Sequence, residues 1–362
     1  MRMLCCRCAD AEHYCRPSRR SMLTMLSATA ASSAMGLRTL RAEGDGPRII
    51  DTHHHIYPPK YVAPNLDRLL KDAGMLPASA YTSWTPQFAL DQMEKAGIAT
   101  ALVSMTSPGV WFDDGNDPAR TRARICNEYG AQMIKDYPGR FGMFAAVPLP
   151  DMDGSLTEIE YALDTLKLDG IGLLTSYNGK LLGDPTFATV FDELNRRKAK
   201  VFVHPTMSCC GNVFPEVTGP IIEFPTDTAR AIVSLALTGT MARCPEITFI
   251  FSHGGGTFPS IVQRMGNAIA GLPPEERAKR LPRGLDYELK RHYYDLASVG
   301  AAPVGMAAVL KLWPITQLTY GSDAPFGATV PIAQGITKLG LDDADLKLIQ
   351  RGNAVRLFPR LA

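Results

Sequence analysis

The chain has 362 residues and carries 38 Lys and Arg against 36 Asp and Glu, a formal net charge of +2. A chain so close to neutral, with no basic run interleaved with aromatic residues, argues against nucleic acid as a partner. Its hydrophobic content of 46% is enough to bury a large core. These values fit one large domain or two ordinary ones.

The first 45 residues differ in composition from the rest of the chain. Ser18-Arg19-Arg20-Ser21 precedes a weakly apolar stretch of small residues that runs to Met35. Paired arginines before such a stretch resemble a twin-arginine export signal, so residues 1–45 are predicted to be a signal peptide and disordered leader, and the mature protein to be periplasmic. If the leader is not a signal, the protein stays in the cytoplasm. The stretch is too short and too rich in Ser, Thr and Ala to predict stable membrane insertion.

Residues 46–362 alternate regularly between predicted strands and helices. Six segments have apolar residues at three- and four-residue spacing and are predicted helices: 86–96, 119–135, 155–166, 186–197, 226–241 and 259–270. Eight short segments between them are predicted strands: 48–55, 99–105, 141–147, 170–175, 200–204, 247–253, 292–298 and 318–323. Eight strands separated by helices predict an α/β fold, a (β/α)₈ TIM barrel that forms one domain from residue 46 to residue 362.

The first predicted strand ends in His53-His54-His55. Successive side chains of a strand point to opposite faces, so His53 and His55 project to the same side and can hold one metal ion between them. The run is neither terminal nor long, and the whole chain has only seven histidines. Metal binding is therefore favoured over an expression tag or a solvated polar stretch.

Further candidate ligands stand at the ends of other predicted strands. His204, His253 and Asp323 each come at or next to the carboxyl end of a strand. In a (β/α)₈ barrel the catalytic residues gather at this end of the strands. The five side chains are therefore predicted to converge on one face as a metal-centred active site.

Four motifs resemble the amidohydrolase superfamily: His53-x-His55, Val203-His204-Pro205, Ser252-His253-Gly254-Gly255-Gly256 and Gly321-Ser322-Asp323-Ala324-Pro325. More narrowly, the chain resembles the branch that contains 2-amino-3-carboxymuconate-6-semialdehyde decarboxylase, γ-resorcylate decarboxylase and 6-methylsalicylate decarboxylase. The His-Gly-Gly-Gly and Gly-Ser-Asp motifs carry this narrower resemblance, which extends over the chain after Gly46.

The resemblance implies that His53, His55, His204 and Asp323 bind one divalent metal ion. Imidazole and carboxylate ligands suit Zn²⁺, with Mn²⁺ as the alternative, and the incomplete protein shell leaves a position open for chemistry. His253 is then the catalytic acid or base beside the metal, and Asp323 is the competing proton donor. The fourth predicted strand ends without the lysine that bridges two metals in other amidohydrolases, so a single ion is expected.

Four residues are candidate substrate contacts. Arg264 resembles an arginine that reaches into the neighbouring subunit's site to bind a carboxylate, which implies a homodimer, and its alternative is an ordinary surface residue. Arg230 is a second candidate, with a structural ion pair to Asp227 as its alternative. Trp111 and Phe326 are candidate walls for a flat ring, although aromatic residues in such loops also serve in packing.

The resemblance implies a metal-dependent, non-oxidative decarboxylase of a small hydroxylated aromatic or enol carboxylic acid. The segments Ala162-Leu163-Asp164-Thr165-Leu166 and Glu193-Leu194-Asn195-Arg196-Arg197 favour a 6-methylsalicylate-like substrate. The alternative is a hydrolase of a small lactone or amide, in which His253 would activate water. A metal-storage or sensory barrel is a third class, but it would give His253 no reason to lie beside the ligands.

Overall fold

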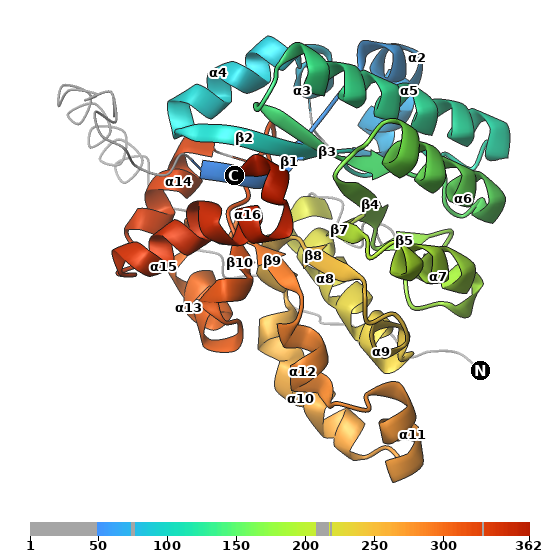
Figure 1. Cartoon of the computed structure of the whole chain (residues 1–362), viewed down its shortest axis with the longest axis vertical. Coiled ribbons are helices and arrows are strands. Elements are labelled where there is room, and N and C mark those ends of the chain that lie inside the picture. The colour runs from blue at the N-terminus through green and yellow to red at the C-terminus, as the bar shows by residue number, and fades with distance from the viewer. Residues whose placement is uncertain (1–48, 74–76, 208–216, 218, 328) are drawn as a thin grey trace, which may run out of the picture. The chain divides into compact units, whose positions relative to one another are not determined.

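Eight parallel strands form a barrel surrounded by helices (Figure 1), in the order β1-β2-β3-β4-β7-β8-β9-β10. This computed structural model describes residues 49–73, 77–207, 217, 219–327 and 329–362, so the predicted signal peptide and leader lie outside the described residues. The strands are β1 (Ile49–His55), β2 (Ile98–Ser104), β3 (Phe141–Ala146), β4 (Gly170–Leu174), β7 (Lys200–His204), β8 (Thr248–Phe251), β9 (Tyr293–Asp295) and β10 (Leu318–Thr319). The predicted (β/α)₈ barrel is confirmed.

The helices between the strands cover the outside of the barrel. They are α2 (Pro59–Ala73), α3 (Ser79–Thr82), α4 (Pro86–Ala96), α5 (Asn116–Asp136), α6 (Met152–Glu160), α7 (Ala188–Arg196), α8 (Gly219–Leu237), α9 (Thr240–Arg243), α10 (Phe258–Ala270), α11 (Pro274–Arg280), α12 (Leu285–Lys290), α13 (Pro303–Leu312), α14 (Thr329–Thr337), α15 (Asp343–Lys347) and α16 (Asn353–Leu357). A two-stranded hairpin, β5 (Ser176–Tyr177) and β6 (Lys180–Leu181), follows β4. All six predicted helical segments are helical, whereas α2, α3 and the helices from α11 to α16 were not predicted.

Apolar side chains fill one end of the barrel interior. Because strand side chains alternate, every second side chain of each strand faces the barrel interior. The strands contribute Ile50, Leu102, Phe144, Phe202, Ile250 and Tyr293, and the last turns of the chain add Ala354, Leu357, Phe358 and Leu361. The C-terminal segment therefore closes the end at which the strands begin, and the opposite end is left for the polar residues.

Three of the predicted strands are shorter than expected. The strand predicted at 318–323 ends at Thr319, and Asp323 has a φ of 59°, which lies outside the extended region of a strand. The strands predicted at 247–253 and 292–298 end at Phe251 and Asp295. His253 and Asp323 therefore lie in loops just past their strands.

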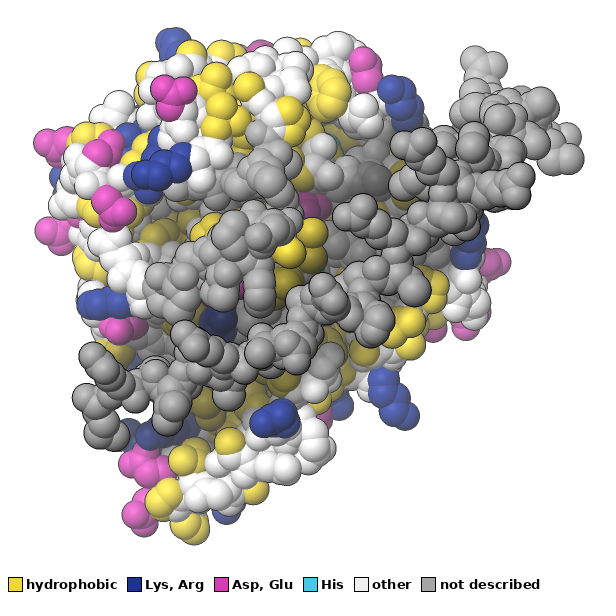
Figure 2. All heavy atoms as spheres, turned by 180° about the vertical axis from the view of Figure 1, so that it is seen from behind, with side chains coloured by type: hydrophobic (Ala, Val, Ile, Leu, Met, Phe, Trp, Pro, Cys, Tyr) yellow, Lys and Arg dark blue, Asp and Glu magenta, His cyan; other side chains and the backbone are white. Residues whose placement is uncertain are grey.

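The described surface mixes both signs of charge. On the face shown in Figure 2, Lys and Arg side chains lie among Asp, Glu and apolar side chains without a field of one sign. Among the described residues, none of the helices has both the length and the apolar character that crossing a membrane requires. Five large apolar side chains of the described residues are exposed, among them Val304 and the neighbours Ile221 and Ile222.

Phe358 tests the apolar closure of the barrel. Its side chain is buried, and its ring lies 5.8 Å from that of Phe144. Phe358→Ala should lower the free energy of unfolding by about 3–5 kcal/mol, the usual range for deleting a buried aromatic ring, as measured by urea unfolding. Arg356→Ala, an exposed change on helix α16, which ends directly before Phe358, is the control and should stay within about 0.5 kcal/mol of the wild type. Equal stability of Phe358→Ala and the control would contradict this role.

Candidate metal centre

Four side chains meet at the carboxyl end of the barrel. His53 and His55 come from β1, His204 ends β7, and Asp323 lies in the loop after β10. One ligand-type atom of each residue lies within 4.8 Å of the others. The imidazoles are buried, and 17% of the Asp323 side chain is exposed. The four predicted ligands are therefore close enough to hold one metal ion.

Asp323 contacts two of the three histidines of β1. Its Oδ1 lies 2.9 Å from His55 Nε2 and 3.2 Å from His53 Nε2. Despite this contact, the buried His53 Nε2 makes no hydrogen bond. A buried polar nitrogen without a partner is costly, and a metal ion would supply the partner. This atom is the clearest sign that the residues fit a metal.

The second ring nitrogen of each ligand histidine faces an oxygen. The pairs are His53 Nδ1 with Asp295 Oδ2 at 3.0 Å, His55 Nδ1 with the Ser104 carbonyl oxygen at 3.2 Å, and His204 Nδ1 with the Pro205 carbonyl oxygen at 2.7 Å. An acceptor at Nδ1 keeps the proton of a neutral imidazole on that atom, so the lone pair of Nε2 is free to bind a metal. All three rings are thus oriented for ligation through Nε2.

Asp51 ties β1 to the loop that carries Asp323. Its buried carboxylate accepts hydrogen bonds from His53 N at 3.0 Å, Ser322 N at 3.0 Å and Ser322 Oγ at 2.5 Å, and it lies 3.1 Å from His54 Nδ1. Asp323 N donates to the His53 carbonyl oxygen at 2.8 Å. These bonds hold Asp323 in its left-handed conformation, which is strained for a residue other than glycine.

A shift in strand register aims the two histidines. β1 pairs with β2, and the register changes between Asp51 and His54. A β-bulge bends the strand and changes which side chains face each side. Ile50 belongs to the apolar barrel interior below, and His53 and His55 both reach the cluster above it.

The charges of the cluster favour a cation. Burial by itself would lower the pKa of His53, but the carboxylates of Asp295 and Asp323 outweigh it and raise this pKa to about 10. Burial lowers the pKa of His55 and of His204, which favours their neutral, ligating forms. Burial would raise the pKa of Asp323, but the histidines around it, His53 first, hold it well below its usual range. An ionised carboxylate therefore faces the shared point between the rings.

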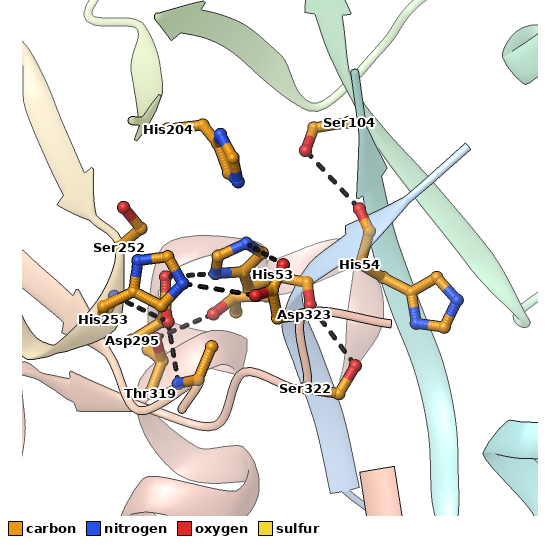
Figure 3. Close-up of polar contacts among 12 residues, drawn as sticks. His53, His54, Ser104, His204, Ser252, His253, Asp295, Thr319, Ser322 and Asp323 are labelled. Atoms are coloured by element: carbon orange, nitrogen blue, oxygen red, sulfur yellow. Dashed lines mark hydrogen bonds and ion pairs between the residues drawn. The ribbon is translucent and has the colours of Figure 1, made fainter. Parts of the chain in front are cut away.

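His253 lies beside the four candidate ligands, in the 3₁₀ turn His253–Gly255 after β8. Its Nε2 is 3.4 Å from Asp323 Oδ2, and its backbone N donates to Asp295 Oδ1 at 3.2 Å (Figure 3). The side chain is 9% exposed, and the buried Nδ1 has no hydrogen-bond partner. His253 thus contacts a candidate ligand while its ring stays available for proton transfer.

The glycines after His253 are required sterically. A Cβ on Gly256 would lie 2.0 Å from the Pro225 carbonyl oxygen, and a Cβ on Gly254 would lie 2.7 Å from a methyl carbon of Val309. All three glycines have positive φ. Only a residue without a side chain suits these positions, which explains the His-Gly-Gly-Gly sequence.

The predicted aromatic walls lie at different distances from the cluster. The Phe326 ring is 5.8 Å from the ring of His55, so it borders the candidate metal position. Trp111 lines a separate pocket of about 210 Å³ together with Thr206. Its Nε1 donates to Asp113 at 2.8 Å and to Asn178 at 3.0 Å. Phe326 is therefore better placed than Trp111 to contact a molecule at the cluster.

The two predicted arginines lie on outer helices. Arg230, on α8, is 3.4 Å from Asp227 and 3.6 Å from Glu223, as its structural alternative requires. Arg264 is exposed on α10, the helix that follows the His253 turn. Within one chain, neither Arg230 nor Arg264 contacts the four candidate ligands. The contacts of these two arginines with substrate therefore stay predictions.

Asp295 and Thr106 are site residues that the sequence analysis missed. Asp295 contacts His53 and His253, and Thr106 Oγ1 lies 3.4 Å from His204 Nε2. Asp295 could have been found, because it stands two residues after the inward-facing Tyr293 in a predicted strand and therefore points into the barrel near its carboxyl end. Thr106 carries no such signal.

Comparisons of sequence and structure find similar proteins among decarboxylases. The chain is 35% identical to a decarboxylase from Penicillium terrestre, over 86% of this chain and 95% of that protein. It is 32% identical to the 6-methylsalicylic acid decarboxylase of Penicillium expansum, over 86% of this chain and 96% of that protein. The fold matches 5-carboxyvanillate decarboxylase from Novosphingobium aromaticivorans, solved with manganese and 4-hydroxy-3-methoxy-5-nitrobenzoic acid, with a TM-score of 0.77, 22% identity, and 87% and 96% of the two chains covered.

The amidohydrolase family model matches residues 50–360, which include the five converging side chains and nearly all of the barrel. With this match and relatives at more than 30% identity along most of its length, the chain belongs to the amidohydrolase family.

Proposed function

We propose that this protein is a metal-dependent, non-oxidative decarboxylase of a small ortho-hydroxylated aromatic acid, with 6-methylsalicylate as the model substrate. One observation carries the proposal: His253 lies 3.4 Å from a candidate metal ligand but outside the four-ligand set. A proton donor next to a chelating site is what removal of CO₂ from such an acid needs. The decarboxylase names of the relatives at 35% and 32% identity support the same reaction.

The reaction exchanges a carboxyl group for a proton. The bond between the ring carbon and the carboxyl carbon breaks, its electron pair stays on the ring carbon, and CO₂ leaves without the need for an oxidant. When bound, a divalent ion would fix the carboxylate and the ortho hydroxyl and stabilise negative charge on them. The proton that replaces the carboxyl group must come from a side chain or from water.

His253 is the proposed donor of this proton. Its ring Nε2 is the atom nearest the cluster, and Asp323 Oδ2 at 3.4 Å orients it. Asp323 is the alternative donor, but its two oxygens already contact His53, His55 and His253. Phe326, whose ring packs at 5.8 Å from His55, would lie against the flat ring of the substrate.

The function is tested by CO₂ release from a panel of acids. We expect purified protein to release CO₂ from 6-methylsalicylate or a related ortho-hydroxybenzoate, to lose this activity after chelation, and to regain it with Zn²⁺ or Mn²⁺. The ion that restores more activity identifies the preferred metal, which the His and Asp ligands leave open. Hydrolysis of a small lactone without CO₂ release from any acid would establish the hydrolase alternative, which the names of these relatives do not favour.

Ligand variants provide the matched controls for this test. Asp323→Asn and His204→Ala should each lose both bound metal, measured by elemental analysis, and turnover. Asp286→Asn makes the same chemical change on a side chain that is 76% exposed and should keep both. Full activity in a metal-free preparation of the wild type would refute the proposed role of the metal.

His253 variants separate proton transfer from metal binding. His253→Asn is preferred to alanine, because asparagine tolerates the left-handed backbone of this position. We expect about one metal ion per chain and a turnover lowered by about 10²–10⁴-fold, the usual contribution of a positioned acid or base. Loss of the metal in this variant would make His253 a ligand, and unchanged turnover would exclude it as the donor.

We also propose a homodimer in which Arg264 contacts the substrate carboxylate of the neighbouring copy. Its support is the exposed position of Arg264 on α10, directly after the His253 turn. A bidentate guanidinium suits a carboxylate better than a lysine would. Both the dimer and this contact stay predictions.

Export through the twin-arginine route is proposed from Arg19 and Arg20 alone. Changing both residues to lysine should retain the precursor in the cytoplasm, because the route recognises the paired guanidinium groups. Fractionation of an expressing bacterial host measures the outcome. A wild-type protein found only in the cytoplasm, or a variant that still reaches the periplasm, would refute the export signal.

A further inference from the structure

Asp295 is a buried carboxylate that touches two parts of the site at once. It is the last residue of β9 and is fully buried. Oδ2 lies 3.0 Å from His53 Nδ1, whereas Oδ1 accepts hydrogen bonds from His253 N at 3.2 Å and Ala297 N at 2.9 Å. Dashed lines in Figure 3 join the Asp295 carboxylate to the ring of His53 and to the backbone of His253. Each of its oxygens therefore serves a different residue of the site.

We propose that Asp295 is a positioning residue with two roles. It determines which ring nitrogen of His53 binds the metal, and it holds His253 in its position beside the metal site. The inference rests on the metal site of the proposed function and assigns no ligand role to Asp295 itself. Its carboxylate acts on metal binding through its contact with the His53 ring. It acts on the proposed proton donor through its hydrogen bond with the His253 backbone. The two halves of the site are thus joined by one side chain.

The His53 contact fixes the form of the imidazole. An ionised carboxylate can only accept a hydrogen bond, so the ring proton of His53 must lie on Nδ1. In the neutral ring, which is the form that binds a metal, Nε2 then has a free lone pair, and this nitrogen lies 3.2 Å from Asp323 Oδ1 among the other candidate ligands. Outer carboxylates of this kind typically change metal affinity by about 10–100-fold when they are replaced.

The His253 contact fixes a strained piece of backbone. His253 has a φ of 58°, which is unfavourable for a residue with a side chain. The bond from its N–H to Asp295 Oδ1 holds the residue in this conformation, and the same oxygen is fixed by Ala297 N. Without this acceptor the buried N–H of His253 would lose its partner, which disfavours this backbone conformation.

Gly321 leaves the space that this arrangement needs. A Cβ at Gly321 would lie 2.8 Å from Asp295 Oδ1 and 2.9 Å from the Cβ of His53. The glycine of the Gly-Ser-Asp motif therefore allows the loop of Asp323 to pass over the contact between Asp295 and His53. This packing keeps the carboxylate in place and excludes a larger residue at position 321.

Asp295→Asn separates the two functions of the carboxylate. The N–H groups of His253 and Ala297 both point at one position, so the amide oxygen must take it and the amide NH₂ must face His53. The NH₂ group can only donate to Nδ1, so the ring proton must then lie on Nε2. A proton on Nε2 competes with the metal for this nitrogen. The affinity for Zn²⁺ should fall by about 10–100-fold, as measured by competition with a chromophoric chelator. At saturating Zn²⁺ the turnover of Asp295→Asn should exceed that of Asp295→Ala, because only in Asp295→Asn does His253 keep its acceptor.

Asp295→Ala removes both contacts and is the second variant. It should lower the affinity for Zn²⁺ and also the turnover at saturating Zn²⁺, because His253 is released. Glu288→Gln is the control. Glu288 is a buried carboxylate on α12, the helix before β9, where it pairs with Arg291. It lies near the start of β9, whereas Asp295 is the last residue of this strand. It should leave the affinity for Zn²⁺ unchanged, whatever its effect on stability.

The outcomes distinguish this proposal from the metal site itself. A wild type that binds no metal refutes the metal site. A wild type that binds Zn²⁺ with the same affinity as a folded Asp295→Asn variant refutes the role of Asp295 alone. If the variants do not fold, nitrogen-15 NMR of the Zn²⁺-loaded wild type decides: a His53 ring with its proton on Nδ1 supports the proposal, and a ring coordinated through Nδ1 overturns it.

Discussion

The hydrogen bonds between β1 and the segment after β10 hold the candidate metal centre together. His55 and Asp323 are 268 residues apart in sequence, and their side chains meet at 2.9 Å. The backbone joins them through bonds from His55 N to the Ala324 oxygen and from Asp323 N to the His53 oxygen, each 2.8 Å long. β10 itself has only two residues, so these bonds and the Asp51 carboxylate close the barrel where the ligands lie. The same hydrogen bonds therefore close the barrel and bring the candidate ligands together.

Two buried carboxylates that are not candidate ligands hold the two strained residues of the site. His253 and Asp323 both have left-handed φ values, a conformation that costs about 1–3 kcal/mol for residues with a side chain. Asp295 accepts the N–H of His253, and Asp51 accepts both the N–H and the hydroxyl of Ser322, next to Asp323. A buried carboxylate is tolerated only when several donors surround it. The two buried carboxylates thus offset the backbone strain at His253 and Asp323. In return, the donors of these loops satisfy the buried charges.

The barrel and the converging side chains could be predicted from sequence, because strand ends and histidine spacing are local patterns. His53, His204 and Asp323 lie where the strand-end argument placed them, although Asp323 lies past a strand shorter than expected. Asp295 was missed because its strand was expected to run to residue 298, which put Asp295 in the middle of the strand, whereas β9 ends at this residue. Its second contact, with the backbone of His253, depends on a left-handed turn that no periodicity reveals. Helix α2 was missed because Pro64 lies inside it and charged residues interrupt its apolar pattern.

The layering of the barrel restricts how a substrate can reach the site. Beneath the rings lies an apolar floor, with the Phe202 ring 5.0 Å from that of His53 and stacked on Phe144. This floor keeps water away and strengthens the contacts between carboxylates and imidazoles above it. The exposed groups are Asp323 at 17% and His253 at 9%, whereas His53 is completely buried. A molecule that enters from solvent would therefore meet the carboxylate and the proposed proton donor before it meets the buried imidazole of His53.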